Sequence, residues 1–444
     1  MEDSAIDLIN INPQRGIQMK CNRHTLLLLV ACTLAVCMNA LSPPSLRAGA
    51  ITYPVSAYAG PELASLRQWE KSWVGKKVGP SAVDGVKELV PGSLYQIMKH
   101  PETWGEIWFE IVPYKTILPS PGDRAFTMKH AGSCRIGPTG ELLNYASGTP
   151  FPAPQSGLEI AWNFECLNYG DNTHALQDLF LIDGKKRYDR KMVFDSYLLY
   201  FAGRREIPST PELLPNPRRI FRASHGAYLE PASMQGSRSV GIKFIDRTTE
   251  YDLWSFSSAT RRIVRSSTAQ RGKTQGGTDS TSDDQNIYDG AIQYMQYKYL
   301  GRQELLLARH QNIDQLKKGH REGYCLPDGF QRERINTHVL ECTHRNPNYL
   351  YSKQVWYIDP ETWWILYADK YDRQGRLWRI FENANCVYTS SYNGVLIANI
   401  GYVSIIDVQA VHSTGGFSNY EIGGTGECYQ PDYYTPKTLQ RLGY

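Results

Sequence analysis

The stretch from Asn346 to Phe381 constrains the fold more than any other part of the sequence. It reads NPNYLYSKQVWYIDPETWWILYADKYDRQGRLWRIF, three runs rich in Tyr, Trp, Val and Ile that are separated by polar breaks. The first break, Asp359-Pro360-Glu361-Thr362, ends a strand because proline has a fixed φ and no N–H to donate to a sheet. The second, Asp372-Arg373-Gln374-Gly375, turns the chain again, since glycine accepts φ > 0. The spacing predicts an antiparallel meander with strands over about 349–358, 363–371 and from 376 onward.

The other elements are predicted from the same local signals. Apolar residues at helical spacing predict helices over 60–73 and 83–98, the second interrupted by Pro91, and a short turn at 100–104. The proline-rich residues 112–127 are predicted to be extended, 126–144 to form a hairpin that turns at 137–140, and 156–163 to begin a helix. Strand-like runs follow to about residue 411, with a turn at Gly301 dividing 292–307, and the chain ends in a glycine-rich loop at 415–426 and a polar tail.

These elements predict a mostly β protein of the α+β class with three parts. Residues 1–50 are an N-terminal extension with a signal peptide, 51–112 a helical region that packs on the sheet, and 113–444 an antiparallel sheet domain with long loops. The composition, 41% hydrophobic and 21% charged, is that of a globular core. A net charge of +4 over 444 residues gives no basis for nucleic-acid binding. The 29 Tyr and 10 Trp suit strand packing, or else a groove for apolar or sugar surfaces.

The N-terminal segment predicts export. Lys20 and Arg23 precede the apolar run Thr25–Met38, which is short for a membrane span and suits a signal-peptide core. Ala48-Gly49-Ala50 offers a cleavage site, and Met19 is an alternative start. A lipid anchor at Cys32 and a retained N-terminal anchor are the alternatives. The expected location is the periplasm or the periplasmic face of the outer membrane.

Cysteine usage agrees with an exported chain. Three of the nine cysteines lie in the N-terminal segment, and the remaining six form an even set, which favours disulfides outside the cytoplasm. Pairing of neighbours in the sequence is the working hypothesis. No CxxC occurs, so no metal site is predicted. The predicted pairs are Cys134–Cys166, Cys325–Cys342 and Cys386–Cys428.

No catalytic motif, and therefore no cofactor or catalytic residue, is predicted. The common nucleophile, zinc and phosphate-binding patterns are absent from the sequence. Residues 268–286, rich in Gly, Ser, Thr and Asp, are either a solvated loop or a gating loop or calcium site. The basic run Arg261–Arg265 is either a solvated strand edge or a contact for an acidic partner or lipid headgroup.

Several short segments, in a fixed order over about 84–442, resemble one family. It is a family of exported Gram-negative proteins known as a domain of unknown function (number 1329), whose members are often labelled outer-membrane lipoprotein-sorting-like. The hairpin segments also resemble those of periplasmic lipoprotein carriers of the LolA/LolB-like fold. The matching segments are Gly148–Pro152, Trp162-Asn163, Trp254-Ser255-Phe256, Arg261–Arg265, Asp283-Asp284, Asp289-Gly290, Tyr351–Lys353, Tyr357–Asp359, Trp363, Tyr371–Trp378, Tyr434-Thr435-Pro436 and Leu439.

The resemblance implies a strongly curved antiparallel sheet, an unclosed half-barrel with helices over an apolar cavity. It implies a periplasmic or outer-membrane-associated, non-catalytic carrier of a lipid or other hydrophobic molecule, working with an RND-type exporter or an outer-membrane protein. The alternatives are a structural or envelope-assembly protein, and a periplasmic glycan-binding protein or enzyme with aromatic platforms. Ordinary core packing is the alternative role for each candidate cavity residue. The candidates are Trp254, Phe256, Trp356, Trp364 and Trp378.

Overall fold

The computed structural model describes residues 53, 56–266, 271–274, 276–320, 326 and 329–443. These residues belong to one compact unit, Ile51–Tyr444. The predicted signal peptide, its cleavage site and Cys325 lie outside the described residues. Among the described residues, no helix is long and apolar enough to cross a membrane.

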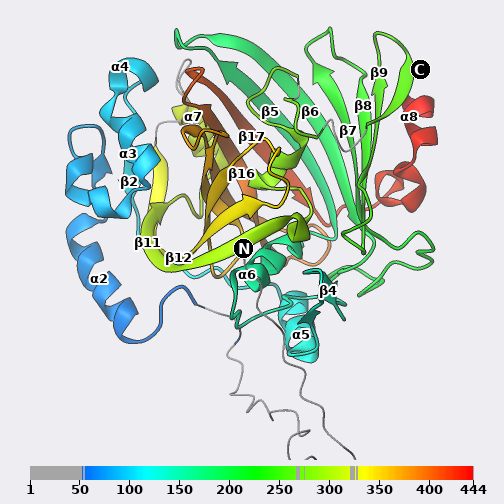
Figure 1. The fold of residues 1–444 in the computed structure, drawn as a ribbon, viewed down its shortest axis with the longest axis horizontal. Coiled ribbons are helices and arrows are strands. Elements are labelled where there is room, and N and C mark those ends of the chain that lie inside the picture. Colours follow the sequence, from blue (N-terminus) through cyan, green and yellow to red (C-terminus); the bar gives the residue numbers. More distant parts are fainter. Residues whose placement is uncertain are drawn as a thin grey trace, which may run out of the picture. The chain divides into compact units, whose positions relative to one another are not determined.

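The helices near the start of the described chain follow the sequence prediction. Helix α2 spans Pro61–Trp73 and begins at a proline, whose missing N–H costs nothing in a first turn. The 3-10 helix η1 (Val83–Leu89) and helix α3 (Gly92–Lys99) are separated at Pro91, and α4 (Pro101–Trp104) follows. They lie together beside the strands β11 and β12 (Figure 1).

The strands form one large sheet and one small hairpin within the described residues. The large sheet has 15 strands in the order β1-β2-β12-β13-β14-β15-β16-β17-β5-β6-β7-β8-β9-β10, with β11 paired to β12, so the ends of the order do not meet. All pairings are antiparallel except that of β2 with β12. The strands are β1 (Lys77–Val78), β2 (Phe109–Ile111), β5 (Asn172–Ile182), β6 (Tyr188–Tyr200), β7 (Ile220–Glu230), β8 (Arg238–Phe244), β9 (Asp252–Ser257), β10 (Arg262–Ser266), β11 (Met295–Leu307), β12 (Phe330–His344), β13 (Lys353–Ile358), β14 (Ile365–Tyr371), β15 (Leu377–Thr389), β16 (Leu396–Asp407) and β17 (His412–Ile422).

The predicted meander is confirmed as β13, β14 and β15. The three strands pair in sequence order, with Trp356 opposite Ala368 and Ala368 opposite Phe381. The predicted fold class, a mostly β chain whose curved sheet remains unclosed, is therefore confirmed by the strand order.

Several local predictions were wrong. Residues 121–130 form helix α5 (Pro121–His130) rather than an extended segment, because Ser120 caps it by accepting a 3.1 Å bond from the N–H of Asp123. The predicted hairpin over 126–144 is reduced to β3 (Arg135–Ile136) and β4 (Leu142–Leu143).

Two glycines that were predicted to lie in a turn or a loop belong to strands of the sheet. Gly301, at φ 98°, marks a β-bulge inside the continuous strand β11 rather than a turn between two strands. Gly415 belongs to strand β17 rather than to a loop. A Cβ at Gly415 would lie 2.4 Å from Cε2 of Phe180, so glycine makes room for that ring.

The helices α6, α7 and α8 complete the fold. Helix α6 (Gly157–Glu165) confirms the helix expected from residue 156, and Ser156 caps it through a bond from Glu159 N. Helices α7 (Ile313–Gly319) and α8 (Pro436–Leu442) were not predicted, and α8 occupies part of the C-terminal tail that was predicted to be polar.

The two faces of the sheet are covered by different parts of the chain. Lys370 and Asp369 are neighbours on β14 and must point to opposite faces. Lys370 Nζ lies 2.5 Å from Asp284 of the 3-10 helix η3 (Ser282–Ile287), whereas Asp369 Oδ1 accepts a 2.6 Å bond from Ser93 of α3. Helix α3 therefore packs on the face opposite to η3.

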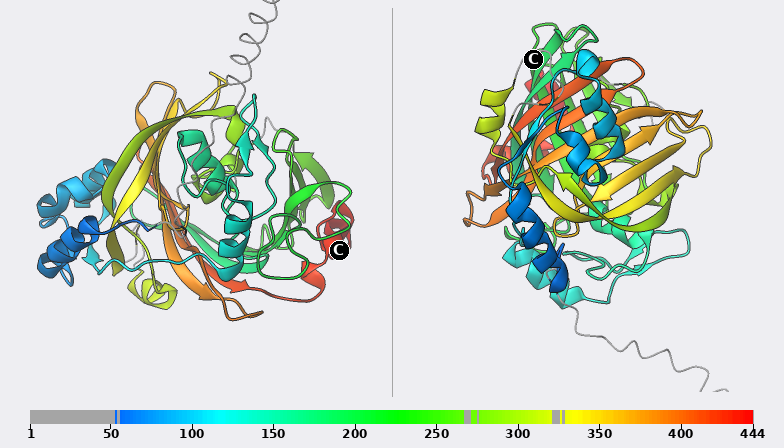
Figure 2. Two further views of the ribbon diagram at one scale, coloured as in Figure 1. Left: turned by 90° about the horizontal axis from the view of Figure 1, so that it is seen from below. Right: turned by 90° about the vertical axis from the view of Figure 1, so that its left-hand side faces the viewer.

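The concave face holds α6 as well as η3. Glu165 of α6 lies 3.4 Å from Lys243 Nζ on β8, and Lys243 also pairs with Asp289 at 2.6 Å. The left view of Figure 2 shows the sheet curving around α6, with α2, α3 and α4 outside it. The resemblance implies helices over an open apolar cavity, but the helices within residues 60–104 lie outside the curve of the sheet (Figure 2). Buried ion pairs of the chain's own α6 and η3 fill that face instead.

Candidate ligand-binding cavity

A cavity lies where the turn between β13 and β14 meets the start of β16 and the segment before α5. Its enclosed volume is about 70 Å³, and about 590 Å³ when the open mouth is included. Helix α6 contributes Asn163 to the wall. One side of the cavity is apolar and the other holds charged side chains.

The apolar side is built from aliphatic and aromatic residues of three segments. Leu118 and Leu396 are 56% and 58% exposed, although both line the cavity. Exposed leucines at a concave mouth are an apolar surface that water covers poorly. The apolar wall is formed mainly by Ile117, Leu118, Pro119, Trp363, Trp364 and Leu396.

Trp363 has an unusual backbone conformation within this wall. Its φ is 61°, in the left-handed region that bulky residues rarely adopt. Asp359 holds the turn, because its carbonyl accepts a 2.8 Å bond from Trp363 N and its carboxylate accepts from Glu361 N at 3.0 Å. Backbone strain of this kind concentrates at binding sites.

Glu361 fixes the base of the cavity. Its carboxylate accepts hydrogen bonds from Ala57 N at 3.1 Å, Ile117 N at 2.8 Å and Arg309 Nη2 at 2.5 Å, and another from the Tyr114 hydroxyl. Arg309 is fully buried and also lies 3.2 Å from Asp359 and 3.4 Å from Glu333. A buried charge is tolerated only when it is paired and hydrogen-bonded in this way.

Asp123 and Arg205 form a second buried pair on the polar side. Arg205 Nη1 lies 2.5 Å from Asp123 Oδ1, and both side chains are less than one tenth exposed. The Tyr53 hydroxyl donates to Asp123 Oδ2 and lies 3.1 Å from Thr149 Oγ1. Burial, and then the Asp123 carboxylate, raise the pKa of the Tyr53 phenol well above its usual value, so the phenol remains a donor.

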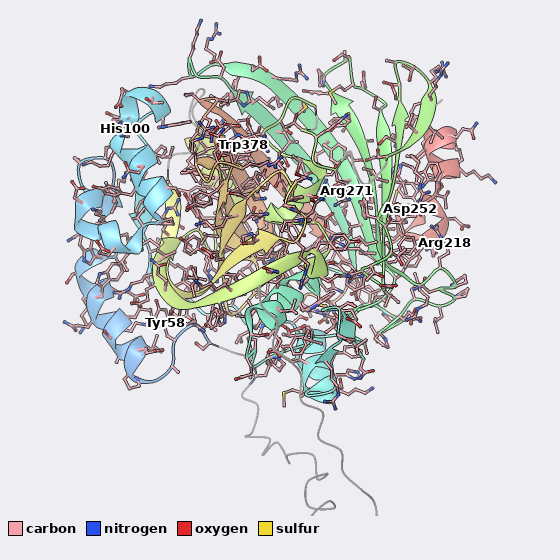
Figure 3. The ribbon with its side chains drawn as sticks, viewed as in Figure 1. Tyr58, His100, Arg218, Asp252, Arg271 and Trp378 are labelled. Carbon is pink, nitrogen blue, oxygen red and sulfur yellow. The ribbon has the colours of Figure 1, made fainter. Side chains whose placement is uncertain are left out.

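The five predicted lining residues are not brought together. Trp364 lines the cavity. Trp356 is fully buried on the concave face, where its ring lies 6.0 Å from that of Phe164 on α6. Trp378 lies in β15, where its Nε1 donates a 2.7 Å bond to Asp407 (Figure 3).

Trp254 and Phe256 lie on the other face of the sheet. Trp254 pairs directly with Val240, and both belong to a cluster that includes Leu439 of α8. Side chains alternate between the two faces along β8. Because Lys243 points to the concave face, Val240 and Ile242 point to the opposite face. Figure 3 shows the neighbouring Arg218–Asp252 ion pair, 3.0 Å long, beside α8. These two residues pack under α8 and not in the cavity.

The predicted disulfides are not present among the described residues. Cys134, Cys166, Cys342, Cys386 and Cys428 are free thiols, and Cys325 is not described. Burial raises the pKa of Cys166 to about 12 and that of Cys386 to about 11, which makes both thiols poor nucleophiles. The predicted pairings are therefore not confirmed.

The acidic residues of the 268–286 segment are engaged with cationic side chains. Asp279 lies 2.7 Å from His412, Asp283 2.6 Å from Arg271, and Asp284 2.5 Å from Lys370. Asp284 is only 3% exposed, so this end of the segment is part of the core rather than a solvated loop. The basic run Arg261–Arg265 falls at β10, the last strand of the sheet, as the edge interpretation expected.

Sequence reasoning missed the residues that define the cavity. Glu361 was interpreted only as part of a strand break, and Asp123, Arg205 and Tyr53 were not singled out. Each lies in a separate segment, and Glu361 and Ala57 are 304 residues apart. Two tryptophans directly after the break, Trp363 and Trp364, were the one local signal that a turn there is buried.

Comparison with known proteins identifies relatives of unknown activity. The family described as "Protein of unknown function (DUF1329)" matches residues 81–440. An uncharacterized protein of Pseudomonas aeruginosa is 25% identical over 316 residues, which cover 68% of this chain and 67% of that protein.

Solved structures with a similar chain course are more distant. A putative outer membrane lipoprotein-sorting protein domain from Vibrio parahaemolyticus is 16% identical, with a TM-score of 0.46, and the match covers 64% of this chain and 98% of that one. A DUF1329 family protein from Desulfovibrio piger is 15% identical, with a TM-score of 0.46 over 64% and 97% of the two chains. A LolA superfamily protein from Nitrosomonas europaea is 12% identical, with a TM-score of 0.38 over 64% and 100%.

Proposed function

This chain belongs to the DUF1329 family of proteins of unknown function, and we propose that it is a non-catalytic binding protein for a lipid or other hydrophobic molecule. The observation that carries the proposal is the cavity, whose apolar wall continues to the surface through Leu118 and Leu396. A wall of Trp, Leu and Ile with a few convergent polar groups is the usual composition of a site for an apolar ligand.

The cavity suits a ligand of limited size. Buried ion pairs of α6 and η3 occupy the concave face, so a bound molecule would rest at the mouth between the β13–β14 turn and the start of β16. Trp364 is only 2% exposed and forms the back of the apolar wall, where its Nε1 donates a 3.3 Å bond to Ala398 O. A rim that is already apolar and exposed lowers the cost of desolvation when an apolar ligand arrives.

The first experiment is native mass spectrometry with organic extraction of protein purified from the periplasm of a Gram-negative host. We expect one apolar species at near-stoichiometric amount. The purified protein should also bind an apolar fluorescent probe, N-phenyl-1-naphthylamine. A monodisperse protein that holds no extracted molecule and does not bind the probe would refute the proposal.

Substitutions at the mouth of the cavity test whether the probe binds there. Leu396→Glu should weaken probe binding by about fivefold or more, because roughly half of a leucine side chain is worth about 1 kcal/mol of apolar contact. Leu214→Glu is the matched control, since Leu214 is 71% exposed and does not line the cavity. Equal losses in the two variants would place the probe elsewhere.

Export is part of the proposal, and the apolar run Thr25–Met38 supports it. Osmotic shock of a Gram-negative host should release the protein with periplasmic markers, and a chain from which residues 25–38 are deleted should stay in the cytoplasm. The family resemblance adds an RND-type exporter as the proposed partner. Chemical crosslinking in the native host, followed by mass spectrometry, should recover that exporter with this protein and not with the deleted chain.

A further inference from the structure

The polar side of the cavity has a charge balance that discriminates among headgroups. Asp123 and Glu361 are two carboxylates among its described lining residues, and Arg205 is the one cation among them. Glu361 is paired with the fully buried Arg309 behind the wall. Arg205 Nη1 contacts Asp123, and Nη2 donates to Gly148 O at 3.0 Å and Cys166 O at 2.7 Å. The Nε of Arg205 has no hydrogen-bond partner among the described residues, but it is buried and closed to solvent.

An anionic headgroup has no suitable partner in this arrangement. Carboxylates and phosphates bind best to an arginine that offers two parallel N–H groups, and the guanidinium of Arg205 has both of its terminal nitrogens engaged. A ligand carboxylate beside Asp123 would lose its hydration and gain no cation in return, because Arg205 already pairs with Asp123 at 2.5 Å in a site less than one tenth exposed.

The chain itself shows which group fits beside Asp123. The phenol of Tyr53 places a neutral hydroxyl on an apolar ring between the Asp123 carboxylate and Thr149 Oγ1. An ionised carboxylate has about four acceptor positions, of which Tyr53 and Arg205 account for one on each oxygen. Asp123 Oδ2 can therefore accept a hydrogen bond from the hydroxyl of a molecule in the cavity in place of the Tyr53 hydroxyl.

We propose that the cavity selects neutral apolar molecules that carry a hydroxyl group, and that this hydroxyl donates to Asp123. This inference rests on the proposed binding function and specifies the chemical class of its ligand. The apolar body of the ligand lies on the exposed leucines of the mouth, Leu118 and Leu396. Anionic amphiphiles, such as fatty-acid carboxylates, are excluded by charge rather than by size.

Three competing ligands with twelve-carbon chains test the inference: 1-dodecanol, methyl dodecanoate and dodecanoate. The affinity of each is measured by its displacement of the fluorescent probe N-phenyl-1-naphthylamine at pH 7.5. Wild-type protein should bind the alcohol most tightly and the ester less tightly, because the ester accepts hydrogen bonds but donates none. It should bind the carboxylate at least about tenfold more weakly than the alcohol.

Two variants separate the effect of the hydrogen bond to Asp123 from the effect of the Asp123 negative charge. Tyr53→Phe keeps the Asp123–Arg205 pair and removes the competing donor, so affinity for dodecanol should rise by about threefold or more while affinity for the ester stays constant. Asp123→Asn removes the negative charge, so the preference for alcohol over carboxylate should fall to about threefold or less. Tyr388→Phe is the matched control, because the Tyr388 hydroxyl donates to Ser418 O and does not line the cavity.

The outcomes distinguish this inference from the proposed function. Probe binding with equal or tighter displacement by dodecanoate, or with no displacement by any of the three compounds, overturns the inference and leaves the binding function in place. Absence of both N-phenyl-1-naphthylamine binding and an extracted ligand refutes the binding function itself. If Asp123→Asn fails to fold by circular dichroism, the Tyr53→Phe result alone decides: unchanged dodecanol affinity overturns the inference.

Discussion

Replacing Asp369 by asparagine should stabilise the protein at neutral pH. Asp369 is 6% exposed and accepts a 2.6 Å bond from the Ser93 hydroxyl, which also lies 2.7 Å from the Tyr367 hydroxyl. Burial raises the pKa of Asp369 from 3.8 to about 6, and the Ser93 hydrogen bond opposes the rise. Asparagine keeps an oxygen that can accept from Ser93 and carries no charge to desolvate.

The size of the effect follows from the two pKa values of Asp369. Well below the unfolded pKa of 3.8 the carboxyl is protonated in both the folded and the unfolded chain, and burial costs little. Between pH 4 and pH 6 the unfolded chain loses its proton first, so the folded state becomes less stable as pH rises. Above pH 6 both states are ionised and the cost is constant at about 3 kcal/mol, since each pH unit between the two pKa values is worth about 1.36 kcal/mol.

Urea unfolding of wild type and Asp369→Asn at two pH values measures this cost. The variant should exceed the wild type in free energy of unfolding by about 1 kcal/mol at pH 4.5 and by about 3 kcal/mol at pH 7.5. Asp189→Asn, at an exposed position of β6, controls for the loss of one negative charge. A difference between wild type and Asp369→Asn that is the same at both pH values would refute the reasoning, because only a titrating group makes it depend on pH.

Two further substitutions test the packing of the sheet by urea unfolding. Gly415→Ala should cost about 1–3 kcal/mol, because the new methyl group meets Phe180 inside β17, whereas Gly272→Ala, with open space around it, should cost far less; equal costs would contradict this account of Gly415. Lys370→Met should cost about 3–5 kcal/mol by leaving Asp284 buried without its 2.5 Å partner, and a cost below about 1 kcal/mol would mean that the pair contributes little.

Local signals predicted the elements that depend on local chemistry. The polar breaks at 359–362 and 372–375 were sufficient to predict β13, β14 and β15, because a proline and a glycine act on their own backbone. Helix α5 was missed since the capping contribution of Ser120 was outweighed by the surrounding prolines. The prediction ended strand β17 too early because it interpreted Gly415 as a loop residue. Glycine is needed there to make room for the ring of Phe180 on the neighbouring strand β5, and not for a turn in the backbone.

The candidate site was beyond sequence reasoning for a different reason. Aromatic residues were expected to face one cavity, but Trp254 packs under α8 and Trp356 packs on α6. The concave face was expected to be empty, but it is filled through pairs such as Lys370 with Asp284, 86 residues apart. Such pairings depend on the register of strands that are distant in sequence. A single sequence does not show which of these distant residues become neighbours.

The four donors on Glu361 determine when the cavity can exist during folding. They come from Ala57, Tyr114, Ile117 and Arg309, so the carboxylate joins the first and the last thirds of the described chain. Contacts so distant in sequence form late, because loop closure must be completed before they contribute. A chain still emerging from a ribosome or a translocation channel has no completed cavity. Under the proposed binding function, only the finished protein can take up an apolar molecule in this cavity.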